Sequence, residues 1–408
     1  MNVIIVNDYA YVNGGASQIA LHTAKSLAYA GCDVYLFSAV GPVDESLKNI
    51  KRLNVICLHQ SDILSNPSRL QAIVQGLWNK KASDAMYALL NSIKNNETIV
   101  HIHTLSKAIS SSIIPIIKKF DIPILYHLHD YGIACPNLGF YDYQKNKICI
   151  YKALGRECLF CDCDRRSYPQ KIWRVLRQMT QRYIGKMPRN IDGFICISNF
   201  SYNILSKYLL DKPVEFLPNN VDVEDIGRVE AEDNKYYVYI GRLSQEKGSI
   251  LLAEAANCLD VPSIFIGDGE DRENIESHAK NAIFTGWLSH EEMLPWLKMA
   301  RALVFPSLWY ETQGLTAIEA LARGIPVIVA NNCAARDAVQ NNVSGRFFES
   351  GDVESLKKVM REFKDQEKVK KYSMNAYNDY RKKDNSDATY IKNLQEIYHK
   401  YLQEKNRK

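Results

Sequence analysis

Two glutamates, Glu311 and Glu319, are placed where carboxylates can hold a sugar. Seven residues separate them, and they lie between the predicted strand Ala302–Phe305 and a predicted helix rich in alanine and leucine. A loop that enters a helix directs free backbone N–H groups and the positive end of the helix dipole at its ligand. We therefore predict that Gly314 and Leu315 cradle a phosphate while the flanking carboxylates bind sugar hydroxyls. A glutamate near a helix start also stabilises the dipole, so the pair alone does not decide function.

The sequence around these glutamates matches a longer pattern. From Pro306 to Glu319, and on through Ala322–Ile328, it resembles the retaining glycosyltransferases of the GT-B fold that carry an E-x7-E motif, of the group 1 or family 4-like type. The resemblance implies a nucleotide-diphosphate sugar as donor, a UDP- or GDP-sugar, with Glu311 on the sugar hydroxyls and Glu319 on the ribose. It also implies that no divalent metal takes part in catalysis.

Two cations upstream of the motif fit the same resemblance. Arg242 lies in a Gly-Arg-Leu triplet and Lys247 in a Glu-Lys-Gly triplet, and both resemble the clamp with which this family holds the donor diphosphate. Negative charge develops on the diphosphate as the glycosidic bond breaks, so fixed cations stabilise the transition state more than the ground state. The other interpretation is that both are solvated surface cations.

Two glycine pairs also resemble parts of the family's donor site. Gly267 and Gly269 follow the predicted strand Ser263–Ile266, at a turn where the absence of side chains lets a nucleotide approach closely. Gly14 and Gly15 resemble the glycine loop near the donor phosphate and the acceptor, although a tight turn explains them equally well. This first loop lacks the G-x-G-x-x-G pattern, which argues against a nicotinamide-dependent oxidoreductase.

His129 resembles the histidine that lines the cleft of these enzymes. It lies just beyond the predicted strand Ile122–His127, where an imidazole can donate a hydrogen bond to the donor sugar near its anomeric carbon. Histidines within strands are more often structural, and we assign that role to His101, His103 and His127.

Half of the ten cysteines fall in one stretch, Cys135, Cys149, Cys158, Cys161 and Cys163. The Cys-x-x-Cys spacing at Cys158 and Cys161 is typical of metal chelates. We predict that Cys135, Cys149, Cys158 and Cys161 hold a structural zinc ion, with Cys163 as an alternative ligand. The other interpretation is a set of reduced thiols in a loop.

A run of basic residues between Tyr168 and Arg189 contains no acidic residue, and apolar residues recur in it at three- and four-residue spacings. This pattern predicts a basic amphipathic helix that lies on an anionic membrane surface. An ordinary solvated helix face is the alternative. The basic residues are Lys171, Arg174, Arg177, Arg182, Lys186 and Arg189.

Two parallel sheets must position these features. Short β-branched runs alternate with helical patterns through the first half, and the same rhythm restarts after Pro218, so we predict an α/β protein with two Rossmann-like domains facing across a cleft, the GT-B fold. The first-half strands are expected at Val3–Val6, Asp33–Phe37, Val55–Leu58, Ile99–His103, Ile122–His127 and Gly193–Ile197. The second-half strands are expected at Tyr236–Ile240, Ser263–Ile266, Ala282–Thr285, Ala302–Phe305 and Pro326–Ala330.

We divide the chain into an N-terminal acceptor-binding domain at residues 1–212, with a cysteine-rich insertion at about 131–168, and a C-terminal donor-binding domain at residues 213–385. The last segment, residues 386–408, is predicted to form a helix. By the family resemblance, this helix packs back on the N-terminal domain.

Composition restricts the class of protein. The chain has 408 residues, 46% of them hydrophobic, and a net charge of +5, which excludes disordered and fibrous proteins and gives no sign of a nucleic-acid partner. No leader and no apolar run of about 20 residues stand out, so we expect a cytoplasmic protein, peripheral at the inner face of the plasma membrane.

The expected reaction is glycosyl transfer with retention, by front-face displacement, to a membrane-associated or cell-surface acceptor such as a glycan or a lipid-linked oligosaccharide. Two alternatives remain open at this point. One is a nucleotide-sugar epimerase of the same fold, and the other is a non-catalytic subunit that binds glycans or docks on membranes.

Overall fold

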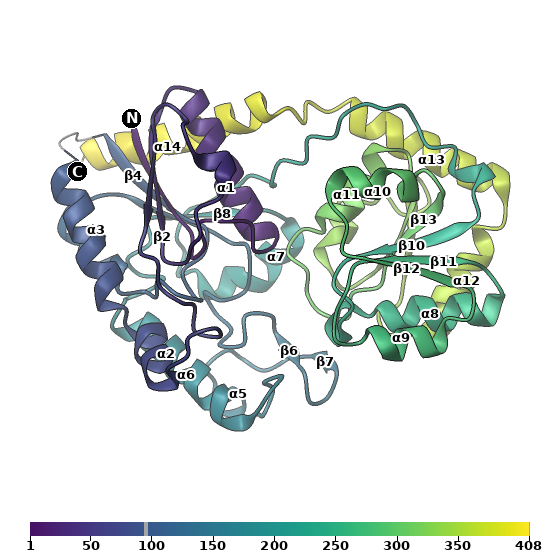
Figure 1. The fold of residues 1–408 in the computed structure, drawn as a ribbon, viewed down its shortest axis with the longest axis horizontal. Coiled ribbons are helices and arrows are strands. Elements are labelled where there is room, and N and C mark those ends of the chain that lie inside the picture. The colour runs from purple at the N-terminus through teal and green to yellow at the C-terminus, as the bar shows by residue number, and fades with distance from the viewer. Residues whose placement is uncertain (94–96, 408) are drawn as a thin grey trace.

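The computed structural model describes residues 1–93 and 97–407 and shows two separate parallel sheets with helices packed around each (Figure 1). Within these residues the first sheet has the order β3-β2-β1-β4-β5-β8-β9 and the second the order β12-β11-β10-β13-β14-β15. The first sheet comprises β1 (Asn2–Val6), β2 (Asp33–Ser38), β3 (Leu53–Cys57), β4 (Thr98–Ile102), β5 (Ile124–His127), β8 (Gly193–Cys196) and β9 (Val214–Phe216). The second comprises β10 (Tyr236–Ile240), β11 (Ser263–Ile266), β12 (Ala282–Gly286), β13 (Ala300–Phe305), β14 (Val327–Ala330) and β15 (Gly345–Phe348).

Helices cover the sheets and form the connections between strands. Those before the second sheet are α1 (Gly15–Tyr29), α2 (Arg69–Leu77), α3 (Lys80–Ser92), α4 (Ile113–Lys119), α5 (Arg156–Phe160), α6 (Tyr168–Tyr183) and α7 (Asn199–Leu205). The later helices are α8 (Ser249–Leu259), α9 (Arg272–His278), α10 (His290–Leu297), α11 (Leu315–Ala322), α12 (Val353–Glu362), α13 (Gln366–Arg381) and α14 (Asp387–Asn406).

The prediction of two Rossmann-like sheets in the GT-B arrangement is confirmed, and every expected strand is present. Burial on both faces explains why the strands read as continuous apolar runs. In β1, Ile4 and Val6 pack in one core cluster, while Val3 and Ile5 pack in the cluster on the opposite face. Alternate residues of one strand therefore hold two helical layers against the sheet.

Two edge strands were not expected. β9 has three residues between Pro213 and Pro218, and β15 has four, Gly-Arg-Phe-Phe. Such short segments carry too little periodicity to stand out. β9 pairs with β8, so the first sheet continues past residue 212, and the second sheet begins at Tyr236.

The chain crosses between the two sheets twice (Figure 1). After α13 it returns, and α14 packs on the first sheet through Tyr390, Ile391, Leu394, Tyr398 and Tyr401. This contact explains a glycine in β8, because a Cβ on that glycine would lie 2.1 Å from the Tyr401 hydroxyl oxygen. The C-terminal helix is thus part of the core of the first unit.

The cysteine-rich segment projects towards the second sheet. It contains the short antiparallel pair β6 (Tyr141–Asp142) and β7 (Lys147–Ile148), and Figure 1 shows this hairpin between the two halves. Arg165 forms an ion pair with Glu270, which follows β11 in the second unit. The insertion therefore contacts both halves of the molecule.

The basic stretch forms helix α6, but several of its charges do not face solvent. Lys171 and Arg177 are buried, and the Arg174 guanidinium lies against the buried carboxylate of Asp164. Arg177 donates hydrogen bonds to the carbonyl oxygens of residues 106 and 136. Three of the six basic residues of the predicted membrane-binding stretch therefore hold α6 against the rest of the first unit.

Trp173 also has a packing role. Its ring lies against α2, where a Cβ on Gly76 would be 2.5 Å from the indole, so only glycine leaves room for the ring. Its indole nitrogen donates to the carbonyl oxygen of Ile73 at 3.4 Å. Within the described residues, no helix has both the length and the apolar character needed to cross a membrane.

Candidate active site

The loop before α11 presents the carboxylate of Glu311 at the carboxyl edge of the second sheet. Its Oε1 accepts hydrogen bonds from Lys247 Nζ at 2.6 Å and from Ser307 Oγ and Trp309 Nε1 at 2.8 Å each. Burial raises the pKa of Glu311, but the charge and hydrogen bond of Lys247 outweigh that effect and the net pKa is lowered. Glu311 is therefore a fixed, ionised group.

Gly314 makes the turn into α11 possible. It has φ 85° at the N-cap position, and a Cβ there would lie 2.5 Å from the Cβ of Ala335. A side chain at Gly314 would be both strained and blocked. The start of α11 lies at the space between the two sheets, where Leu315 and Thr316 line a cavity.

The two predicted cations are placed differently. Lys247 pairs with Glu311, and its ammonium also lies 5.1 Å from the centre of the Trp309 ring. Arg242 turns to the buried Glu246, whose Oε1 accepts from its guanidinium at 2.8 Å, and half of the Arg242 side chain is exposed. Only Lys247 is in place at the cavity described next.

A cavity of about 310 Å³ lies between the two sheets. Across it, Thr312 Oγ1 donates to the carbonyl oxygen of His129 at 2.9 Å, and a Cβ on Gly15 would lie 3.7 Å from Leu315 Cδ1. The structure thus brings residues of both halves to one site, as the cleft expected from sequence requires. The predicted residues that line this cavity are Gly15, His129, Lys247, Glu311, Gly314 and Leu315.

Glu319 does not line the cavity. It lies in the second turn of α11, where burial raises its pKa and the nearby His290 and Arg323 lower it by less. A ligand that fills the cavity and also meets Glu319 must extend along α11.

Gly267 and Gly269 have a structural explanation. A Cβ on Gly267 would lie 2.0 Å from the Gly241 carbonyl oxygen, and one on Gly269 would lie 2.1 Å from that of Leu243. Neither glycine lines the cavity, so the close approach they allow is between two backbone segments. Gly14 caps α1 with φ 108° and no atom within 4 Å of its Cβ position, which fits a turn.

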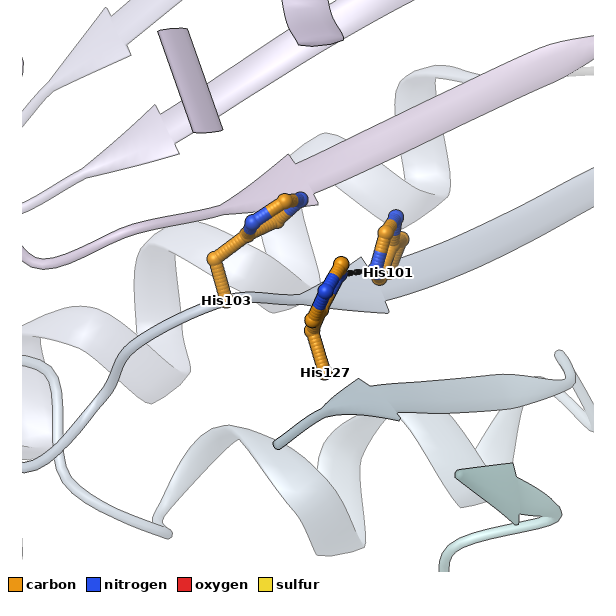
Figure 2. A group of neighbouring side chains, drawn as sticks. All are labelled: His101, His103 and His127. Atoms are coloured by element: carbon orange, nitrogen blue, oxygen red, sulfur yellow. Dashed lines mark hydrogen bonds between the residues drawn. The ribbon is translucent and has the colours of Figure 1, made fainter. Parts of the chain in front are cut away.

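His129 belongs to a cluster of four histidines at the ends of β4 and β5. Its ring stacks on His127 at 4.0 Å between centres, and its Nε2 shares a hydrogen bond of 2.8 Å with His103 Nδ1. Burial lowers the pKa of His129 and of His101 to about 3, so both rings are neutral near pH 7. Figure 2 shows the other three members, His101, His103 and His127, with their rings converging.

The predicted zinc ligands do not form a ligand set in this structure. Cys161 Sγ lies 3.6 Å from a carboxylate oxygen of Asp142, and the buried ammonium of Lys171 donates to Cys158 Sγ at 3.7 Å. Burial raises the pKa of Cys135 to about 11 and that of Cys161 to about 12, which favours the thiol form. In the described part of the chain, no three cysteine sulfurs lie within 4.8 Å of one another. As arranged here, the Lys171 ammonium occupies the space beside Cys158, and the cysteine zinc site stays a prediction.

Two residues of the site had been given no role in the sequence. Gln313 accepts from the backbone N–H of Asn219 and donates to its carbonyl oxygen, at 3.2 Å each, and so ties the motif loop to the linker between the sheets. Both residues line the cavity. Their only signal in the sequence is their position, one inside the motif and one directly after Pro218, where the strand pattern restarts.

Two family models together match most of the chain. The model described as Glycosyltransferase Family 4 matches residues 13–225, and the model described as Glycosyl transferases group 1 matches residues 222–379. Among curated proteins, the chain is similar to the alpha-monoglucosyldiacylglycerol synthase of Streptococcus pneumoniae, 23% identical over 264 residues, which are 58% of this chain and 58% of that protein. In this relative and in two further ones, the segment that matches this chain spans 25% to 58% of the relative's own length.

Solved structures share the whole fold. The sucrose-phosphate synthase of Thermosynechococcus elongatus superposes with a TM-score of 0.72 and 16% identity, covering 98% of both chains. HepE of Anabaena, in complex with UDP, superposes with a TM-score of 0.68 and 14% identity, covering 98% of this chain and all of that one. The Glycosyltransferase Family 4 model matches more than half of the chain, and both sheets have the GT-B arrangement. The chain therefore belongs to Glycosyltransferase Family 4 and is a GT-B glycosyltransferase.

Proposed function

We propose that this chain transfers a sugar, with retention of anomeric configuration, from a nucleotide-diphosphate sugar to a membrane-associated glycan or lipid-linked acceptor. One observation carries the proposal: the ion pair of Lys247 with Glu311 faces His129 across a cavity of about 310 Å³ formed by both halves. A cation, a fixed carboxylate and a neutral imidazole around one space suit a sugar diphosphate. The UDP bound by HepE, a structural neighbour, agrees with this class of donor.

The donor would lie with its diphosphate at the start of α11, where the N–H groups of Leu315 and its neighbours and the Lys247 ammonium meet its negative charge. Glu311 would accept hydrogen bonds from the sugar hydroxyls, and Glu319 would bind the ribose further along the helix. Arg242, now held by Glu246, reaches the diphosphate only after a change of rotamer.

In the proposed reaction, the acceptor hydroxyl oxygen bonds to the anomeric carbon on the face from which the diphosphate departs. The bond between that carbon and the phosphate oxygen breaks, and the hydroxyl proton passes to the departing phosphate. Lys247 stabilises the charge that develops on the leaving group, and the imidazole of His129 borders the sugar. Among the described residues, Glu311 is the one carboxylate that lines the cavity, and its Oε1 already accepts hydrogen bonds from Lys247, Ser307 and Trp309, which favours front-face displacement over a covalent intermediate.

A surface on the first unit suits a lipid-bound acceptor. Helices α2 and α6 lie side by side, and both expose large apolar side chains, among them Leu70 and Val74 with 77% and 63% of their surface exposed. Arg182, Lys186 and Arg189 are exposed at the end of α6 and after it. We call this the α2–α6 surface, and its apolar residues are Leu70, Ile73, Val74, Ile172, Leu176 and Met179.

Apolar side chains that enter the interface and cations that meet anionic headgroups are the two contributions that bind a peripheral protein to a bilayer. We therefore propose that the α2–α6 surface binds an anionic bilayer.

The test is co-sedimentation with anionic and neutral vesicles. A Leu70→Ser, Leu176→Ser variant and an Arg182→Glu, Arg189→Glu variant should each lose binding, while Tyr29→Ser, a control exposed on α1, should keep it. Equal binding by all variants would refute this surface.

The proposed activity is tested by incubating the protein with UDP- and GDP-sugars, with and without a lipid extract as acceptor. We expect release of the nucleotide to depend on the acceptor and a glycolipid product to form. Conversion of the donor to its epimer without any acceptor would instead indicate the epimerase. Failure of every donor to bind would leave only a non-catalytic role.

A further inference from the structure

Three histidines outside the assigned donor contacts converge at one point of the first sheet. His101 lies in β4, His103 directly follows that strand, and His127 is the last residue of β5. All three side chains are buried. One ring nitrogen from each lies within 4.8 Å of the other two, and no other group of three metal-ligating side chains in the described residues is this close (Figure 2). The parallel pairing of β4 with β5 produces this arrangement, because it sets His101 opposite Leu125 and so brings the ends of the two strands together.

Each ring has one nitrogen on the side of the other two rings, which we call inner, and a second nitrogen directed to other residues, which we call outer. His101 Nε2 and His127 Nδ1 face each other at 3.2 Å, and His103 Nε2 is buried without a partner. Two ligands that are each about 2.0 Å from a tetrahedral zinc ion are about 3.3 Å apart, so the observed separation is compatible with a metal-bound pair as well as with a hydrogen bond. In this structure the two nitrogens share a hydrogen bond, whose donor depends on the tautomers of the two rings.

Each outer nitrogen has a neighbour of the kind that orients a metal ligand. His101 Nδ1 shares a hydrogen bond of 2.6 Å with the hydroxyl of Tyr398, and His103 Nδ1 shares one of 2.8 Å with His129 Nε2. His127 Nε2 faces Asn219, whose Oδ1 is also buried and unpartnered. Ligand histidines in proteins are held by a hydrogen bond of the second ring nitrogen to an outer group that fixes the tautomer, and His101 and His103 have such a bond here.

We propose that His101 Nε2, His103 Nε2 and His127 Nδ1 bind one divalent transition-metal ion of the zinc type. Imidazole ligands suit Zn²⁺ and Co²⁺ and disfavour Mg²⁺ and Ca²⁺. The ion would join the ends of β4 and β5 and, through the bond from His103 to His129, would fix the orientation of the cleft histidine. This is a positioning role, separate from the donor chemistry proposed above.

The experiment uses the full chain, stripped with a chelator and titrated with Co²⁺, whose visible absorption reports the ligands. We expect one Co²⁺ per chain with weak d–d bands and no intense sulfur-to-metal charge-transfer band in the near ultraviolet. A Cys158→Ser, Cys161→Ser variant should give the same spectrum. His399→Gln, the control, changes an exposed histidine of α14 and should also bind normally.

Loss of an outer hydrogen-bond partner alone weakens metal affinity by up to about a hundredfold. Substitution of a ligand itself should therefore weaken Co²⁺ binding by at least that factor. We expect this for His103→Gln and His127→Gln, with unchanged near-ultraviolet circular dichroism. No binding by the wild-type protein, equal binding by the histidine variants, or a charge-transfer band that disappears in the cysteine variant would each overturn the proposal. If the histidine variants do not fold, the wild-type spectrum still decides between histidine and cysteine ligands. Donor binding and transfer, measured separately, test the proposed function independently of this site.

Discussion

The ion pair of Lys247 with Glu311 should contribute measurably to the stability of the protein without any ligand. The ammonium nitrogen and the carboxylate oxygen are 2.6 Å apart, and only 24% and 13% of the two side chains are exposed. Two unit charges about 4 Å apart interact by about 4 kcal/mol at an effective dielectric constant of about 20. Residual solvation and the retained contacts to Ser307 and Trp309 reduce the net value, and we expect a coupling energy of about 1 to 3 kcal/mol.

A double-mutant cycle measures this coupling. The four proteins are the wild type, Glu311→Gln, Lys247→Met and the double variant, and the quantity compared is the free energy of unfolding in urea. Each single change leaves one buried charge unpaired and should lower the free energy of unfolding for that reason. The double variant should therefore lose less stability than the sum of the two single losses. A coupling energy below about 0.5 kcal/mol would refute the reasoning.

The same pair has a defined pH dependence. The pKa of Glu311 is lowered below its ordinary value of 4.5, so the folded state holds the ionised form more strongly than the unfolded state does. The stabilising contribution is therefore fully present above about pH 4.5 and is lost as the pH falls through the lowered value. Repeating the cycle at about pH 7 and about pH 4 should show a smaller coupling at the lower pH. A coupling that grows on acidification would contradict the assignment.

Three further predictions concern Glu319, Gly269 and the pair of Cys158 with Cys161. Glu319→Ala should weaken donor binding about ten- to hundredfold, since it removes a charged hydrogen-bond acceptor, and an unchanged dissociation constant by calorimetry would remove it from the ribose site. Gly269→Ala should lower the melting temperature even without donor, because its Cβ would lie 2.1 Å from the carbonyl oxygen of Leu243, and a normal melting temperature would mean that the loop adapts freely. Cys158→Ser, Cys161→Ser should leave the metal content measured by elemental analysis unchanged, whereas loss of one zinc per chain would restore the cysteine site expected from sequence.

The sheets could be predicted because burial on both faces leaves a strong signal. β10 and β11 have the bounds expected from their apolar runs, Tyr236–Ile240 and Ser263–Ile266. The edge strand β9 has neither the length nor the apolar continuity to be recognised. Its place in the sheet depends on pairing with β8, and the residues of a short segment do not indicate which strand it will pair with.

Side-chain contacts between distant segments explain the remaining differences. A count of charges along α6 treats Lys171 as solvent-facing, but the insertion folds over it and places Cys158 against its ammonium. The assignment of His103 and His127 as ordinary strand residues missed their convergence, because that depends on which strands are neighbours. The position of Glu311 in a helix-entry loop was predictable from its motif, whereas its pairing with Lys247 required the loops of two strands to meet.

The central claim is that a nucleotide-diphosphate donor binds in the cavity between the two sheets. Hydrogen–deuterium exchange with and without UDP or GDP locates the bound nucleotide directly. We predict slower exchange in the loop and first turns at residues 306–319 and in the segment 241–248, with no such protection in Lys247→Met at the same nucleotide concentration. Protection confined to other segments, or the same protection in the Lys247→Met variant, would contradict the assignment of this cavity as the donor site.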